Sequence, residues 1–157
     1  MDTLAVLLAG RAVGSIAGQD ERVNQLEEGI ALDLDFGKLA KVAATGADVL
    51  PVVLQDHDSG DVLFVGYANQ EAVKVSLRER IAVLWSTSRN ELWRKGATSG
   101  DTLALVDIRV NCDQNSLLYV VRRTTGGACH TQSPSGAPRP TCYYRTIVDE
   151  TSLEHVL

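Results

Sequence analysis

Three cysteines are the residues of this 157-residue chain best suited to chemistry. Cys112 follows an apolar run that predicts a strand, Cys129 follows Gly-Gly, and Cys142 follows a stretch rich in Pro, so all three are expected in turns. An odd number of cysteines argues against a disulfide framework in a reducing compartment. A free cysteine is often a small buried apolar residue, whereas polar, Gly and Pro neighbours suit ligands that folding brings together. Both interpretations stay open on this pattern.

A shared metal ion for these cysteines would be zinc, because zinc accepts sulfur ligands in tetrahedral geometry and is redox-silent. Three protein ligands leave a fourth position open for water, as in catalytic zinc sites, whereas structural zinc is closed by four ligands. The chain has no C-x₂₋₄-C pair, so cysteine spacing alone is a weak signal.

A second stretch, from Leu84 to Thr102, combines three positive charges with two tryptophans, hydroxyls and glycines. Charge, hydroxyl groups and backbone N–H groups can hold a phosphate while an aromatic side chain covers a base. The candidate substrate-binding residues are Trp85, Ser86, Ser88, Arg89, Trp93, Lys95, Gly96, Ser99 and Gly100. A solvated hairpin with two core tryptophans explains the same pattern and is the alternative.

The first elements expected in the central region are a hairpin and a helix. Residues 49–55 and 62–68 are β-rich runs joined by the polar turn DHDSGD, which predicts a hairpin. Asn69 can cap a helix that continues to about Arg80. The residues expected on one face of this helix are Val73, Leu77 and Ile81.

A second hairpin is expected around the first cysteine. Residues 103–110 alternate, with Ala104, Val106, Ile108 and Val110 facing one way and Leu105, Asp107 and Arg109 the other. Residues 116–121 form another apolar run. Cys112 therefore lies in or beside the turn between two strands.

The N-terminal 30 residues predict one or two short helices, and residues 31–157 the main domain. Asp2 and Arg11 fit poorly in a secretory signal, and no apolar run reaches the roughly 20 residues that span a bilayer, so a cytoplasmic protein is expected. The formal net charge of −5 gives no general attraction to nucleic acid or anionic membranes. Neither is an expected partner.

Six segments, in order, carry a resemblance to a known family: LDFGKLA, PVVLQD, WSTSRNELWRKGATSG, NCDQN, GGACHT and TCYYR. Together they resemble the phosphoribosyl-AMP cyclohydrolases over about residues 32–147. The resemblance implies an α+β fold dominated by mixed β-sheet, in an intertwined homodimer. It also implies a zinc ion at the subunit interface, held by Cys112 of one chain and by Cys129 and Cys142 of the other.

The resemblance implies a reaction of histidine biosynthesis, the hydrolytic opening of the adenine ring of 1-(5-phosphoribosyl)-AMP between N1 and C6. Ribosylation at N1 makes C6 electrophilic, so hydroxide can add there. Three thiolates give a zinc site net negative charge, which makes its water less acidic than on a site of three histidines, so a neighbouring base would help. His130, next to Cys129, is the expected catalytic base, and a hydrogen-bonded loop histidine is the alternative.

The chain departs from the family pattern around the first cysteine. The family's Asp-Cys-Asp-x-Asp motif, whose carboxylates are associated with magnesium, here runs from Asn111 to Asn115 and keeps only Asp113 as a carboxylate. Magnesium prefers anionic oxygen ligands, so its binding is expected to be weak or absent. Ala97 replaces another family carboxylate, and the segment between Cys129 and Cys142 is longer than expected.

Other functions stay open. A diverged zinc hydrolase could act on a different purine-like heterocycle, and a non-enzymatic module could use zinc to staple a dimer. A zinc nucleobase deaminase is disfavoured, because the H-x-E and P-C-x-x-C signature is absent. A cysteine nucleophile paired with His130 is the least favoured, since sequence neighbours seldom aim their side chains at each other.

Overall fold

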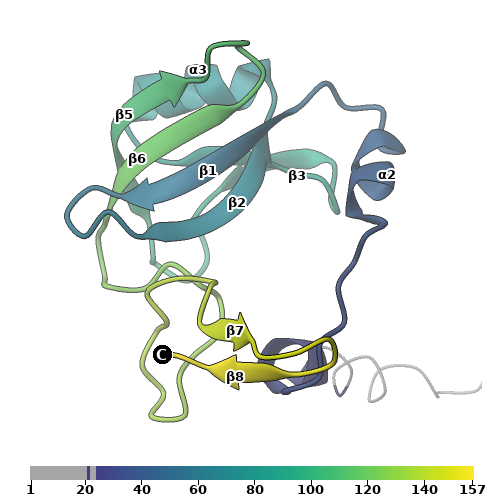
Figure 1. Cartoon of the computed structure of the whole chain (residues 1–157). Helices are drawn as coiled ribbons and strands as arrows, with labels where there is room; N and C mark the ends of the chain where they lie inside the picture. Colours follow the sequence, from purple (N-terminus) through teal and green to yellow (C-terminus); the bar gives the residue numbers. More distant parts are fainter. Residues whose placement is uncertain (1–20, 22–23) are drawn as a thin grey trace, which may run out of the picture.

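The computed structural model describes residue 21 and residues 24–157 (Figure 1). Residues 24–28 are helical, as expected; the remainder of the predicted helical extension, 1–20 and 22–23, lies outside the described residues, and the boundary at residue 31 stays a prediction. The elements that follow are α2 (Lys38–Ala43), β1 (Leu50–Asp56), β2 (Val62–Ala68), α3 (Gln70–Glu79), β3 (Val83–Ser86), β4 (Glu91–Arg94), β5 (Leu103–Val110), β6 (Leu117–Arg123), β7 (Arg145–Ile147) and β8 (Leu153–His155).

The central sheet is mixed, with the strand order β2-β1-β6-β5. Both predicted hairpins are present, because β1 pairs antiparallel with β2 and β5 pairs antiparallel with β6. The two hairpins join through a parallel pairing of β1 with β6, in which Val52 lies opposite Leu117. The α+β class with a dominant mixed sheet is therefore confirmed.

Helix α3 begins as predicted, and two of the three residues expected on one face pack against the core. The Asn69 side chain accepts a hydrogen bond from Ala72 N at 2.8 Å, and Arg80, with a φ of 57°, ends the helix. The fully buried residues of the helix are Ala72, Val75 and Ser76. Of the expected face, Val73 and Ile81 pack against the core, whereas Leu77 is exposed. Small residues let α3 approach β3 closely, and Ser76 Oγ bonds both the N–H and the carbonyl of Val83 at 3.0 Å.

The alternation predicted for residues 103–110 is interrupted. The pairing with β6 shifts between Leu105 and Asp107, which marks a β-bulge. Leu103 and Leu105 are buried in the core, and beyond the bulge Ile108 packs against it instead. Residues on both of the predicted faces therefore contact the core, because the extra residue reverses the alternation.

Two further hairpins lie beside the sheet. Strands β3 and β4 pair antiparallel, so the Leu84–Thr102 stretch does contain a hairpin, with Trp85 and Trp93 half-buried. The β7–β8 hairpin, which the sequence did not predict, lies below the sheet in Figure 1. It is hydrogen-bonded to residues 30–32, because Leu32 N donates to Thr151 O and Leu153 N donates to Ile30 O. Within residues 21 and 24–157, no helix has both the length and the apolar character that a membrane span needs.

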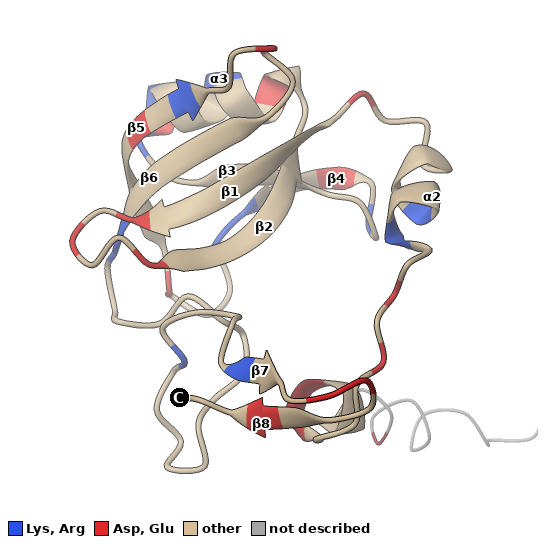
Figure 2. Cartoon of the chain, in the orientation of Figure 1, with Lys and Arg blue, Asp and Glu red and all other residues tan. Residues whose placement is uncertain are grey.

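The acidic β1–β2 turn, red in Figure 2, is fixed to the end of β6 by a buried carboxylate. Asp56 is 3% exposed, accepts hydrogen bonds from Asp58 N at 2.9 Å and Ser59 N at 3.0 Å, and pairs with Arg123 Nε at 2.7 Å. Burial opposes ionisation of Asp56, but these donors outweigh it and hold its pKa below the usual value. The ionised form therefore stabilises the fold.

The Asp56→Asn variant should lose about 1–3 kcal/mol of unfolding free energy at neutral pH, the usual cost of losing a charge-assisted hydrogen bond at a buried site. Because the folded-state pKa is lowered, this stabilisation is complete above the ordinary pKa of Asp, about 4, and is lost as the pH falls through the folded value. Urea unfolding of the parent and of Asp56→Asn should therefore give unfolding free energies whose difference is constant at neutral pH and shrinks below about pH 4. A difference that grows on acidification would contradict this account.

Candidate active site

The structure brings two of the three cysteines together. Cys129 is buried and Cys142 is exposed, and the two thiols share a hydrogen bond. Their backbones are held separately, since Cys129 N donates to Arg139 O at 3.1 Å and Cys142 N donates to Leu63 O, in β2, at 2.8 Å. A loop of twelve intervening residues thus returns against the edge of the sheet to place one sulfur beside the other.

Close packing at the base of this loop requires glycine at position 127. A Cβ atom on Gly127 would lie 2.5 Å from Pro138 Cβ, which no real side chain tolerates. The Gly-Gly before Cys129 therefore lets the two ends of the loop approach each other.

The two thiols have opposite proton affinities. The hydrogen bond from Cys142, with further bonds from Thr131, lowers the pKa of Cys129 to about 5 despite its burial. The same hydrogen bond, together with lost solvation, raises the pKa of Cys142. One thiolate is thus present at neutral pH, and the thiolate is the form that binds metals and attacks electrophiles.

A pocket with a volume of about 230 Å³ opens beside Cys142. Its lining residues are Phe64, Trp93, Lys95, Gly96, Ala97, Thr98, Ser99, Ala128, His130 and Cys142. The Phe64 and Trp93 rings lie 6.2 Å apart, tilted by 41°, and form an aromatic wall. Predicted residues from the tryptophan-rich stretch and from the cysteine loop therefore meet at one cavity.

Lys95 places a positive charge at this pocket although it is only 6% exposed. Its Nζ donates to Asp101 O at 3.3 Å. Burial lowers the pKa of Lys95, and the neighbouring Asp101 and the two cysteines oppose that shift. The next residue, Gly96, has a φ of +84°, and a Cβ there would lie 2.3 Å from Thr102 N, so only glycine can form this wall.

His130 lies at the rim of the pocket, with its side chain 72% exposed. Its Nε2 lies 2.7 Å from Glu27 Oε1, from the helical turn near the start of the described chain. His130 thus both lines the cavity and is a hydrogen-bonded loop histidine, so the two interpretations drawn from the sequence are compatible.

Five of the candidate substrate-binding residues do not line this pocket: Trp85, Ser86, Ser88, Arg89 and Gly100. Trp85 borders a separate hollow with Asn90, whereas the Ser86 and Ser88 hydroxyls lie 3.3 Å from each other within the β3–β4 turn. Arg89 pairs with Glu91 at 3.0 Å. Gly100 instead closes the pocket loop, because its N–H donates to Gly96 O at 2.8 Å.

Cys112 lies apart from the other two cysteines. It is exposed in the β5–β6 turn, beyond the end of the sheet where Val110 pairs with Leu117, whereas Cys142 bonds β2 near the opposite end. Among the described residues, no group of three or more His, Cys, Asp or Glu side chains is arranged to hold a metal ion within one chain. Within one described chain, Cys112 therefore does not join the other two cysteines.

The Cys112 turn is organised by its two asparagines. Asn111 Oδ1 accepts hydrogen bonds from Asn115 N and Ser116 N, both at 2.9 Å, and Asn111 Nδ2 donates to Asn115 Oδ1 at 2.8 Å. The side-chain oxygens are thus engaged within the turn. Asp113 lies exposed between them.

The sequence did not point to several residues around the site. Phe64 was assigned only to a strand, and Arg139, Glu27 and Glu28 were given no role. Arg139 was detectable in principle, because an arginine flanked by Pro138 and Pro140 in an otherwise uncharged loop needs a partner. That partner is Glu28, more than a hundred residues away in sequence, which no local pattern indicates.

Comparison with known proteins gives one family. A family model described as phosphoribosyl-AMP cyclohydrolase matches residues 64–144, which include the pocket and both cysteines of the pair. A phosphoribosyl-AMP cyclohydrolase of Haloarcula marismortui is 46% identical over 109 residues, covering 69% of this chain and 85% of the relative. One of Chloroherpeton thalassium is 35% identical over 127 residues, covering 81% and 84%. The histidine biosynthesis bifunctional protein HisIE of Aquifex aeolicus is 37% identical over 99 residues, which is 63% of this chain and 45% of that protein.

The fold, the pocket and these matches define a hydrolase that acts on a cyclic amidine. More specifically, the chain belongs to the phosphoribosyl-AMP cyclohydrolase family.

Proposed function

We propose that this enzyme opens the adenine ring of 1-(5-phosphoribosyl)-AMP by hydrolysis of the N1–C6 bond, in histidine biosynthesis, with zinc as its metal. The observation that carries the proposal is the pocket in which an aromatic wall and the Lys95 ammonium lie beside the hydrogen-bonded pair of Cys129 and Cys142. A purine can pack on the wall, a phosphorylated substrate needs a positive charge, and the thiols can hold a metal at the reacting end.

The donor set fits zinc. Cys142 lies near enough to Cys129 to lower the pKa of its thiol to about 5, and the described cysteines are all free of disulfides. Sulfur-only donors suit zinc rather than magnesium or calcium. When bound by three thiolates, zinc supplies a Lewis acid and lowers the pKa of water at its open position.

The chain's own residues then have distinct roles. Phe64 and Trp93 orient the base, and the buried Lys95 offsets the negative charge of the thiolates and of the substrate's phosphates. His130, at the rim beside Cys142, moves protons as water adds to C6 and N1 leaves. These roles require the reacting carbon to lie between the cysteine pair and the imidazole.

The third ligand is proposed to be Cys112 of the partner chain in a homodimer. Cys112 is exposed and lies at the other end of the sheet from the pair, so its own chain cannot bring it there without refolding. A two-fold symmetric dimer would give two equivalent sites, each with two cysteines from one chain and one from the other.

Replacement of each cysteine by serine tests the zinc site. Each of the Cys112→Ser, Cys129→Ser and Cys142→Ser variants should bind less zinc than the parent, measured by elemental analysis of the purified protein, and should lose hydrolysis. The parent should bind about one zinc per chain, as one tetrahedral site per protomer requires. Full zinc retention in all three variants would refute the proposed site.

Magnesium is proposed to have little part in the activity. The Asn111 and Asn115 side chains satisfy each other within the turn, and two neutral amides provide less electrostatic attraction for a hard divalent ion than two carboxylates would. Asp113 is the one carboxylate of the turn that could contribute to a magnesium site, with water and the substrate's phosphates as further ligands.

The double variant Asn111→Asp with Asn115→Asp should acquire a magnesium requirement. Two carboxylates would replace an amide pair whose closest atoms lie 2.8 Å apart, and they would repel each other unless a cation lay between them. After chelation and zinc reloading, titration with magnesium should activate the variant and change the parent little. A parent that is inactive until magnesium is added would show that the substitutions have not removed this requirement.

A further inference from the structure

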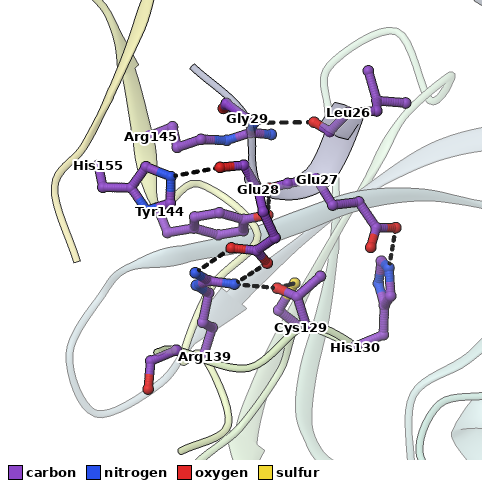
Figure 3. Close-up of polar contacts among 12 residues, drawn as sticks. Leu26, Glu27, Glu28, Gly29, Cys129, His130, Arg139, Tyr144, Arg145 and His155 are labelled. Carbon is purple, nitrogen blue, oxygen red and sulfur yellow. Dashed lines mark hydrogen bonds and ion pairs between the residues drawn. The ribbon is translucent and has the colours of Figure 1, made fainter. Parts of the chain in front are cut away.

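We propose that Glu27 is a positioning residue that holds the His130 imidazole at the rim of the pocket, and that residues 24–28 form a strap that fixes Glu27 there. This inference rests on the proposed function, because it takes His130 as the group that moves protons. The strap lies outside the segment that the family model matches, residues 64–144. Figure 3 shows its contacts with the cysteine loop and the C-terminal hairpin.

The strap is anchored by a buried arginine. The Arg139 side chain is 1% exposed, and its Nη1 and Nη2 donate to the two carboxylate oxygens of Glu28 at 2.6 and 2.8 Å. The guanidinium also lies 4.0 Å from the centre of the Tyr144 ring and bonds Thr131 Oγ1 at 3.0 Å. Thr131 in turn contacts Cys129 Sγ at 3.2 Å, so the anchor connects the strap directly to the cysteine loop.

The carbonyl end of the strap is held as well. The last carbonyl groups of a helix lack partners within it. Here Tyr144 Oη donates to Glu27 O at 2.6 Å, and Arg145 Nη1 donates to Leu26 O at 3.0 Å and Gly29 O at 2.9 Å. His155 Nε2 lies 3.3 Å from Glu28 O (Figure 3). The helical turn is therefore fixed from two sides, with the Glu27 side chain extending toward His130.

The contact with Glu27 determines the orientation and the tautomer of the His130 ring. Glu27 Oε1 lies 2.7 Å from His130 Nε2, and an ionised carboxylate can only accept. Nε2 therefore carries a hydrogen, and the lone pair of a neutral ring lies on Nδ1. Because the His130 side chain is 72% exposed, little packing restrains its ring, and the carboxylate is its side-chain hydrogen-bond partner among the described residues.

Removal of the carboxylate should impair turnover rather than binding. In Glu27→Ala, kcat should fall about 10- to 100-fold, part of the 10²- to 10⁴-fold that a general acid or base contributes, whereas KM should stay within about twofold. The kcat of Glu27→Gln should fall less than that of Glu27→Ala, because the amide oxygen can accept the same hydrogen bond. Bound zinc and the urea midpoint should match the parent. Gln25→Ala, an exposed side chain on the same helical turn, is the control and should behave as the parent.

A double-mutant cycle separates positioning from other roles. If Glu27 acts through His130, adding Glu27→Ala to a His130→Gln enzyme should cause no further loss of kcat. Parent-like kcat in Glu27→Ala, loss of bound zinc in that variant, or full multiplication of the two losses in the double variant would each overturn the assignment. A His130→Gln enzyme as active as the parent would instead refute the proposed role of His130, and this inference with it.

Discussion

Hydrolysis should return when two inactive variants are mixed, Cys112→Ser with Cys129→Ser. In a hybrid dimer, the Cys112 of one chain and the intact cysteine pair of the other form a complete site, although the second site of the same dimer lacks two ligands. Random exchange makes half of the dimers hybrids, so about one quarter of all sites should recover activity. The measurement is the rate of ring opening per chain after exchange, relative to the parent.

The matched control is a mixture of Cys129→Ser with Cys142→Ser. Both changes affect the pair that one chain supplies, so each pair in a hybrid lacks a sulfur and no site is complete. Recovery in this control, or none in the first mixture when mass-labelled chains prove subunit exchange, would contradict a site shared between subunits.

Glu28→Ala should be the most destabilising single change outside the core. It leaves the Arg139 guanidinium buried beneath Tyr144 without its carboxylate. Removal of one partner of a buried ion pair costs roughly 3–5 kcal/mol, and because Glu28 itself is 36% exposed, we expect about 2–4 kcal/mol here. Urea unfolding at neutral pH measures this loss.

The double variant Glu28→Ala with Arg139→Met is the control for this prediction. Methionine keeps much of the apolar stem of arginine and removes the charge, so the double variant should be more stable than Glu28→Ala alone. Glu150→Ala, an exposed acidic residue of the β7–β8 turn, should cost little. A double variant that is less stable than Glu28→Ala would show that packing of the arginine, rather than its charge pairing, dominates.

The local elements of the fold were predictable, and their long-range pairing was not. The first hairpin follows from two β-rich runs around a polar turn, and α3 from the Asn69 cap. The parallel pairing of β1 with β6 joins residues more than sixty positions apart, and no local pattern specifies it. The face expected for α3 was right for Val73 and Ile81 and wrong for Leu77. Ser76 takes a core position that a polar residue was not expected to hold, because its hydroxyl is satisfied on β3.

In the candidate site, too, the residue types were predictable and the long-range contacts were not. Residue types predicted a cysteine site and an aromatic, basic stretch, and the structure brings Trp93, Lys95 and His130 to one pocket with Cys142. Trp85 and Arg89 have the same chemical character but lie elsewhere, because the β3–β4 hairpin turns them away from that pocket. The strap was not predictable, since the partners of Glu27 and Glu28 come from a loop more than a hundred residues further along the chain.

The most direct test of the proposed function is incubation of the purified, zinc-loaded enzyme with 1-(5-phosphoribosyl)-AMP while ultraviolet absorbance reports the opening of the adenine ring. We expect stoichiometric conversion to the ring-opened product without added magnesium, and no conversion by Cys129→Ser. An enzyme that is folded and fully loaded with zinc, yet leaves this substrate unchanged both with and without magnesium, would contradict the proposal.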